Sequence, residues 1–327
     1  MLIKPYIPKN FGKEYYYIKG HDQYPMFLAV ALGVKPSFDD WIPVKKYDEF
    51  VKACAKYGLV VEPDVVFTQP KNDKKNIVGG ENITTTFRSG KRFDKEETEE
   101  GNVHVFVAKT REKALEAKKF GWYSVVINNR STNKPFIDHL RFGECLGFPD
   151  CCIDFFRKYN NWHLYSHPYE TFKNTLAISG RAKGSYYCNN FLMDHTYFFI
   201  HHLSCSYRCE KTIEFAKKVE EKIAEVEQDY VQKTVEMLKK PLLVFGEKNF
   251  VIFNGNLSKN KSDYILEYDN CEYLKNPARP EESINFFNSI KSGNKIMIEN
   301  NNLIIKDNDS ILKTIEKKPE WFMISFD

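Results

Sequence analysis

The chain has 327 residues, of which 42% are hydrophobic and 28% charged, a composition typical of globular proteins and unlike that of disordered ones. Its 48 basic and 44 acidic residues nearly balance, so the chain lacks the global charge excess of a dedicated nucleic-acid-binding protein. The amino-terminal segment has no signal-peptide core, and no window approaches the ~18 apolar residues of a membrane span. We therefore expect a cytoplasmic protein without membrane contact, in which the eight cysteines stay reduced.

The sequence predicts an α/β or α+β fold with three domains, over residues 1–137, 138–240 and 241–327. The first domain alternates periodic helices with apolar strands: helices at 47–57 and 110–121, and strands at 60–69, 103–108 and 122–129. The last strand, helix and strand form a βαβ unit, which favours a parallel or mixed sheet. No glycine-rich phosphate loop accompanies this unit, so no nucleotide is inferred.

The second and third domains differ in pattern. Residues 138–240 read as mostly helical and contain six of the eight cysteines. Residues 206–240 are amphipathic and form either one long helix or two helices separated by a kink. Beyond Pro241, short apolar segments separated by Asn and Gly turns predict a small antiparallel sheet, with strands at 242–246, 249–255, 263–268, 295–300 and 302–307.

The segment GFPDCC places Cys151 and Cys152 side by side at a predicted helix start. Pro149 is favoured at the first helical position and Asp150 complements the positive end of the helix dipole, which also stabilises thiolates. Because neighbouring side chains on a helix point about 100° apart, we expect only one of these two thiols to bind a given metal, unless the helix begins between them.

A second group, Cys205 and Cys209, lies in HHLSCSYRC. If Ser204 or Ser206 caps the following helix and Cys205 is in its first turn, the spacing puts both sulfurs on one helix face. Clustered cytosolic cysteines favour metal binding or catalysis, although free cysteines are also common small core residues. Cys145 and Cys188 are each equally compatible with a place in the core or with metal ligation. Cys54 and Cys271 are expected to be structural.

The sequence is compatible with more than one kind of metal centre. A structural zinc site usually shows two Cys-x2-Cys knuckles, which are absent here. Thiolates gathered from helix starts also suit an iron-sulfur cluster, and the number of cysteines leads us to favour a four-iron cluster, with zinc as the alternative.

Three further side chains are candidates for a role in chemistry. His202, three residues before Cys205, and His195, beside Asp194, are candidate proton donors or ligands. His201 adjoins His202 and competes with it for that role. Arg208 lies between the two cysteines and is suited to hold an anionic substrate or to offset the negative charge of a cluster.

The two cysteine segments resemble the motifs G-[FY]-P-x-C-C and H-x-x-C-S-x-x-C of a largely archaeal, domain-of-unknown-function family. The resemblance covers residues 138–240, on the following positions: Gly147, Phe148, Pro149, Cys151, Cys152, His202, Cys205, Ser206 and Cys209. It implies a shared cysteine site and a methanogen-type origin, and it implies no reaction.

Two functions follow from these residues. The first is a cytoplasmic iron-sulfur enzyme that performs sulfur-transfer or redox chemistry on a small metabolite or a tRNA base. The second is a zinc-stapled, non-catalytic module that binds a protein or RNA partner. Thiol catalysis without a metal ranks last, because an adjacent cysteine pair does not easily form an unstrained disulfide.

Overall fold

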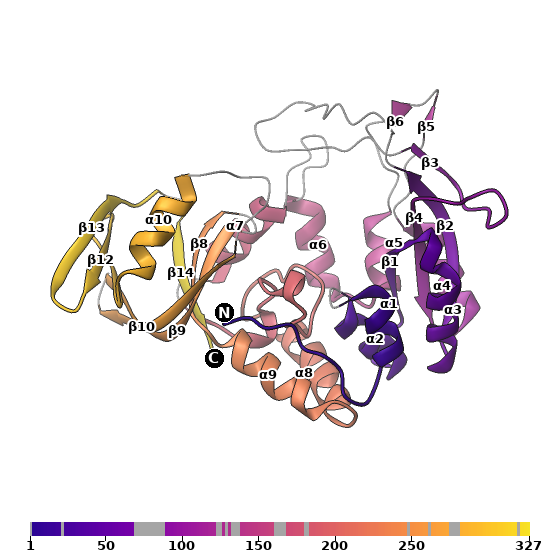
Figure 1. The fold of residues 1–327 in the computed structure, drawn as a ribbon, viewed down its shortest axis with the longest axis horizontal. Coiled ribbons are helices and arrows are strands. Elements are labelled where there is room, and N and C mark those ends of the chain that lie inside the picture. The colour runs from indigo at the N-terminus through magenta and orange to yellow at the C-terminus, as the bar shows by residue number, and fades with distance from the viewer. Residues whose placement is uncertain are drawn as a thin grey trace.

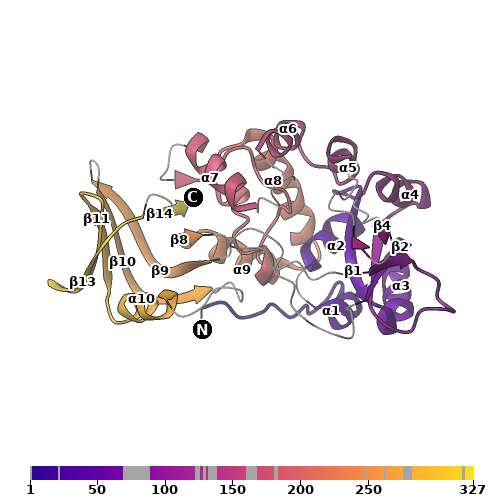
Figure 2. The same ribbon diagram turned by 90° about the horizontal axis from the view of Figure 1, so that it is seen from above.

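A computed structural model describes residues 2–20, 23–68, 89–121, 126–127, 130–131, 138–159, 168–179, 183–246, 249–260, 263–274, 282–318 and 321–327. A four-stranded sheet lies at one end of this elongated molecule, an eight-stranded sheet at the other, and helices lie between them (Figure 1). Figure 2 shows the same arrangement from above. Within the described ranges, no helix is both long and apolar enough to cross a bilayer.

The amino-terminal part packs helices on an antiparallel sheet of order β1-β4-β2-β3. Its elements are α1 (Lys13–Lys19), α2 (Tyr24–Ala31), β1 (Ser37–Pro43), η1 (Val44–Lys46), α3 (Tyr47–Lys56), β2 (Val60–Thr68), β3 (Ser89–Arg92), β4 (Asn102–Ala108) and α4 (Arg111–Phe120). The expected helix at 47–57 is α3, which buries Phe50 and Cys54 as its amphipathic spacing predicts.

The α+β class is confirmed, but the parallel pairing of a βαβ unit is not formed. Strand β4 is antiparallel to β1 on one side and to β2 on the other, so both of its edges are already paired by strands that precede it in the chain. Within the expected strand at 122–129, the structure describes only β5 (Val126–Ile127), which forms a hairpin with β6 (Arg130–Ser131).

The middle part is helical, as expected. It comprises α5 (His139–Cys145), α6 (Asp150–Tyr159), α7 (Pro168–Ser179), β7 (Lys183–Gly184), η3 (Tyr186–Cys188), η4 (Met193–His195), α8 (Glu210–Ala224) and α9 (Gln228–Leu238). The predicted amphipathic stretch is two helices. They separate at Glu227, whose buried carboxylate accepts hydrogen bonds from the backbone N–H groups of Asn10 and Phe11 and from the Tyr6 hydroxyl.

The carboxy-terminal sheet is larger than the small one expected. Its order is β13-β12-β11-β10-β9-β8-β14-β7, and it is antiparallel except where β14 pairs with β7. The elements are β8 (Leu242–Gly246), β9 (Asn249–Asn260), β10 (Asp263–Leu274), α10 (Glu282–Lys291), β11 (Lys295–Glu299), β12 (Asn302–Asp307), β13 (Ser310–Glu316) and β14 (Phe322–Phe326). The five expected strands are all present, and β7, β13 and β14 complete the sheet.

Two hydrophobic cores hold these parts together. One core runs from Ile3 to Phe326 and contains buried residues from all three predicted domains, including Cys152 and Cys209. The other lies within the carboxy-terminal sheet, where residues of the strands and of α10 bury one another. The cysteine-bearing segments therefore belong to the larger core, and the three-domain division stays a prediction.

Candidate metal centre

Helix α6 presents Cys151 and Cys152 in its first turn. The helix begins at Asp150, and the backbone N–H of Cys152 donates to the Pro149 carbonyl at 2.9 Å. The turn that joins α5 to α6 requires Gly147, which has a φ of 71° and whose missing Cβ would lie 2.6 Å from Pro36 Cδ. The local sequence thus positions the two thiols as the Pro-Asp helix start predicts.

The other two thiols come from the segment that leads into α8. Helix α8 begins at Glu210, with Cys209 as its N-cap, so the expectation that Cys205 lies in the first helical turn is wrong. A tight turn replaces that turn of helix: the Cys209 N–H donates to the Ser206 carbonyl at 3.1 Å. Ser206 Oγ accepts from the Arg208 N–H at 3.1 Å and therefore caps this turn rather than α8.

Helix α7 fixes the same segment from outside. Thr175 Oγ1 donates to the Ser204 carbonyl at 2.7 Å, and the Tyr207 N–H donates to Ser179 Oγ at 2.7 Å. Both anchoring hydroxyls lie on α7, and their partners, Ser204 and Tyr207, flank Cys205 along the chain. The position of Cys205 is therefore set by packing against α7 and not by helical periodicity.

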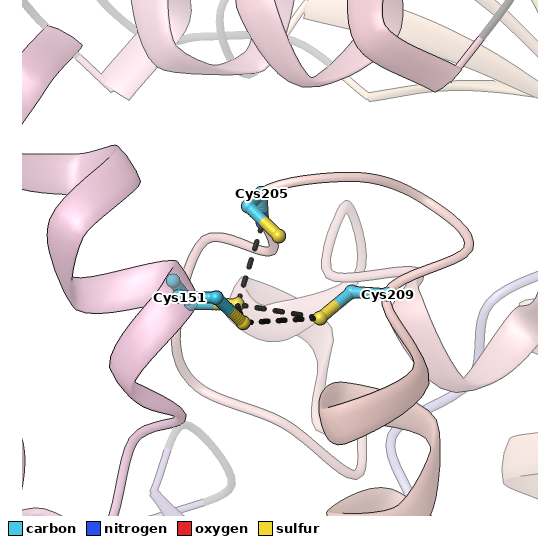
Figure 3. A group of neighbouring side chains, drawn as sticks. Cys151, Cys205 and Cys209 are labelled. Carbon is cyan, nitrogen blue, oxygen red and sulfur yellow. Dashed lines mark hydrogen bonds between the residues drawn. The ribbon is translucent and has the colours of Figure 1, made fainter.

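The four sulfurs converge on one point. Those of Cys151, Cys152, Cys205 and Cys209 all lie within 4.8 Å of one another. The separation is 3.9 Å between Cys151 and Cys152, and Cys209 Sγ lies 3.6 Å and 3.7 Å from these two sulfurs. Figure 3 shows the Cys151 and Cys209 side chains pointing toward each other from α6 and from the start of α8, with Cys205 above them.

The expectation that only one of the adjacent cysteines joins the group is therefore corrected. The Cβ atoms of neighbouring helical residues diverge, but each sulfur lies one rotatable bond further out. Rotation about that bond brings both sulfurs to the same side when the partner segment approaches at the helix start.

The charges on these thiols depend on one another. The hydrogen bond from Cys152 lowers the pKa of Cys209, whereas that same contact, together with burial, raises the pKa of Cys152. Burial raises the pKa of Cys151 and of Cys205. Without a cation the group thus favours a single thiolate, at Cys209. A bound cation would remove the repulsion that opposes further deprotonation.

Hydrogen bonds surround the sulfur group. Thr212 Oγ1 lies 3.3 Å from Cys152 Sγ and 2.9 Å from His202 Nε2. The Cys205 N–H donates to Cys152 Sγ at 3.4 Å. Buried Thr212 is a functional residue that the sequence interpretation missed, although its place three residues after Cys209, on the same face of α8, is a usable signal. Such contacts orient ligands and tune a bound metal.

An ion pair bridges the two cysteine segments at the surface. Lys211 Nζ lies 2.6 Å from Asp150 Oδ1, so the first turn of α8 is paired with the first residue of α6. Both side chains are largely exposed, and the energetic value of the pair is correspondingly small. Cys188, in η3, lies on the buried side, where its sulfur is 4.0 Å from the Cys209 carbonyl.

His202 lies next to this group, but its environment differs from that of a proton donor. It is 4% exposed, and burial lowers its pKa to about 3, so the imidazole is neutral. It reaches the sulfurs only through Thr212. The geometry thus places His202 as a residue that orients Thr212, and a catalytic role for it stays a prediction.

The remaining predicted residues lie outside the sulfur group. Cys145 ends α5, where burial raises its pKa to about 11. His195 ends η4, and the exposed Arg208 donates through Nε to the Lys183 carbonyl at 3.0 Å. Catalytic roles for His195 and Arg208 stay predictions. Cys54 and Cys271 are buried in the larger and the smaller core respectively.

Comparison of this chain with protein-family models, with curated proteins and with solved structures finds no match. Membership of the family that shares the two cysteine motifs therefore stays a prediction, and function must be argued from the geometry of the site.

Proposed function

We infer that Cys151, Cys152, Cys205 and Cys209 bind one tetrahedral metal ion, and that this ion is Zn²⁺. The observation that carries the proposal is the spacing of the sulfurs: those of Cys151, Cys152 and Cys209 are 3.6, 3.7 and 3.9 Å apart, and that of Cys205 lies within 4.8 Å of each. A tetrahedral ion with metal–sulfur bonds of about 2.3 Å holds its sulfurs about 3.8 Å apart. The described donor set supplies four thiols for such an ion.

A four-iron cluster, the first expectation from the sequence, fits this spacing less well. Each cysteine of such a cluster binds a different iron, and the iron–sulfide core occupies the space between the thiolates. The cysteine sulfurs must then lie farther apart than the edge of a single ion's tetrahedron. A limit of 4.8 Å on every pair of ligand atoms leaves little room for that core.

The role that follows is structural. A site with four protein ligands has no open coordination position for a substrate, and closed sulfur sites of this kind stabilise folds. Here the ion would join α6, the 205–209 turn and the start of α8. All eight cysteines are free thiols, which favours a reducing compartment such as the cytoplasm. This proposal supports the second function given above, without assigning its protein or RNA partner.

Metal analysis of protein purified without oxygen tests the proposal. We expect a colourless protein with about one zinc per chain. Replacing Cys205 and Cys209 together with serine should abolish zinc binding, whereas Cys271→Ser, a matched buried thiol in the other core, should leave it unchanged. A brown protein with about four iron and four sulfide per chain would contradict the zinc assignment and restore the iron-sulfur enzyme.

A further inference from the structure

A cavity of about 270 Å³ lies beside the sulfur group, between α5, α6, β1 and the segment before Cys205. Its walls are mostly apolar and include Phe142, Leu146, Phe148, Ile153 and Phe156. A cavity of about 150 Å³ holds a benzene molecule, so this one has room for an aromatic ring with a short substituent. Small-molecule sites in proteins share this combination of apolar walls and a few polar groups.

The polar side chains that line the cavity are Asp39, His139, His201 and His202, together with the thiol of Cys152. The Asp39 carboxylate pairs with His104 Nε2 at 3.0 Å, and its side chain keeps 29% of its surface accessible. Burial opposes ionisation of Asp39, but the hydrogen bond and the charge of His104, with the charges of His201 and Lys35, outweigh it and lower the pKa. Asp39 is therefore an anionic acceptor at the cavity wall.

His202 belongs to the cavity wall but is itself buried, at 4% exposure. Its Nδ1 is buried and has no hydrogen-bond partner among the described residues. Its Nε2 faces Thr212 Oγ1 at 2.9 Å, and Thr212 in turn faces Cys152 Sγ. The Asp39 carboxylate is therefore the acceptor that a ligand in the cavity can reach.

We propose that this cavity binds a small aromatic amine, with the ring between the apolar walls and the ammonium donating to the Asp39 carboxylate. The nearby Lys35 does not occupy this place, because its Nζ donates to the Leu146 carbonyl and lies 4.7 Å from the Phe148 ring. The proposal goes beyond the structural metal centre and does not depend on which metal occupies it.

Three probes that share a benzyl group test the chemistry of the cavity on the full, metal-loaded chain. Benzylamine, benzyl alcohol and phenylacetate are titrated separately, with binding measured by saturation-transfer NMR and calorimetry. We expect benzylamine to bind with a Kd on the order of 1 mM or tighter. Benzyl alcohol should bind about tenfold more weakly, and phenylacetate should not bind, because Asp39 repels it. Equal binding of all three probes, or no binding of benzylamine, would overturn the proposal.

Variants locate the binding and separate it from the metal. Leu146→Trp fills the cavity and should abolish benzylamine binding, whereas Leu115→Trp, on the exposed face of α4, should not. Asp39→Asn keeps the shape and should lower benzylamine affinity to that for benzyl alcohol. Benzylamine binding that survives both cavity variants would refute the assignment. Metal content is measured on each variant, so that a failure of the zinc proposal is recognised independently.

Discussion

Thr212 is a single buried hydroxyl that connects a histidine to the sulfur group. It lies 3.3 Å from Cys152 Sγ and 2.9 Å from His202 Nε2, and its own side chain is fully buried. Hydrogen bonds to metal-bound thiolates reduce their charge and orient them. The strength of metal binding should therefore depend on this one oxygen atom.

We predict that Thr212→Val weakens metal binding by about 10- to 100-fold, because it removes the hydroxyl while keeping the volume. Thr212→Ser keeps the hydroxyl and serves as the control, with affinity close to that of the original protein. Competition against a coloured zinc chelator measures both. Equal affinities for the valine and serine variants would show that the hydroxyl does not act on the sulfurs.

Asp40 is a buried carboxyl group that faces Lys19 and Tyr15. It is 3% exposed, and burial raises its pKa from 3.8 to about 6, against the opposing charge of Lys19 at 2.8 Å. A group with a raised pKa in the folded state contributes stability below its unfolded pKa and loses it as the pH rises through the folded value. The free energy of unfolding should therefore fall between about pH 4 and pH 6, as Asp40 ionises, and stay lower above that range.

We predict that Asp40→Asn removes this dependence. From pH 4 to pH 7, the free energy of unfolding of the original protein should fall, relative to that of Asp40→Asn, by on the order of 2 to 3 kcal/mol. Urea unfolding at the two pH values measures it. A difference that is constant across this range would mean that Asp40 ionises as an ordinary carboxyl group does.

At the scale of elements, the junction between α8 and α9 is held by Glu227. This carboxylate accepts from Asn10 N at 2.6 Å, from Phe11 N at 2.7 Å and from Tyr6 Oη at 2.6 Å. The residue is 1% exposed, so these three donors depend on it for partners. One side chain thus fixes the break between two helices and attaches the amino-terminal segment to them.

We predict that Glu227→Ala lowers the free energy of unfolding by about 3 to 5 kcal/mol, because the buried Tyr6 hydroxyl and two partly buried backbone N–H groups lose their acceptor. Glu227→Gln retains an oxygen for the backbone donors and should cost about 1 to 2 kcal/mol. Denaturant unfolding compares the two, with Glu225→Ala, at an exposed neighbouring position, as the control. Similar losses for alanine and glutamine would show that the charge, and not the acceptor geometry, is what matters.

At the scale of the whole molecule, removal of the metal should affect one core and spare the other. Cys152 and Cys209 lie in the larger core, whereas Leu266 and Tyr268 of β10 and Ile296 of β11 lie in the carboxy-terminal core. After chelation we predict faster amide hydrogen exchange at the start of α6, in the 205–209 turn and at the start of α8, with unchanged exchange in β10. The Cys205→Ser, Cys209→Ser double variant should not respond to the chelator. Uniform exchange changes throughout would contradict a local role.

Local patterns predicted most of the elements. The spacing of Phe50 and Cys54 gave a helix with the correct buried face, and apolar runs such as residues 242–246 gave strands. The helix start at Pro149 and Asp150 and the grouping of Cys205 with Cys209 also follow from neighbouring residues. These features depend on interactions within a few residues, which a single sequence records.

Features that depend on distant partners could not be predicted in the same way. The parallel pairing of β14 with β7 joins residues about 140 positions apart. Strand β4 pairs on both sides with strands that precede it in the chain, β1 and β2. The convergence of Cys151 and Cys152 with Cys205 depends on α7, which holds the Cys205 segment in place. Sequence periodicity indicates which face of a helix or strand is apolar, but it does not indicate which of these faces pack against each other.

The four-sulfur group also has a consequence for the unfolded chain. Cys151 and Cys209 are 58 residues apart, so a metal held by both would close a large ring of backbone. By the arithmetic used for a disulfide, closing a ring of that size removes unfolded-state entropy worth about 4 kcal/mol. A metal that stayed bound during unfolding would thus restrict the conformations of the unfolded chain. This contribution to stability would disappear when the ion dissociates.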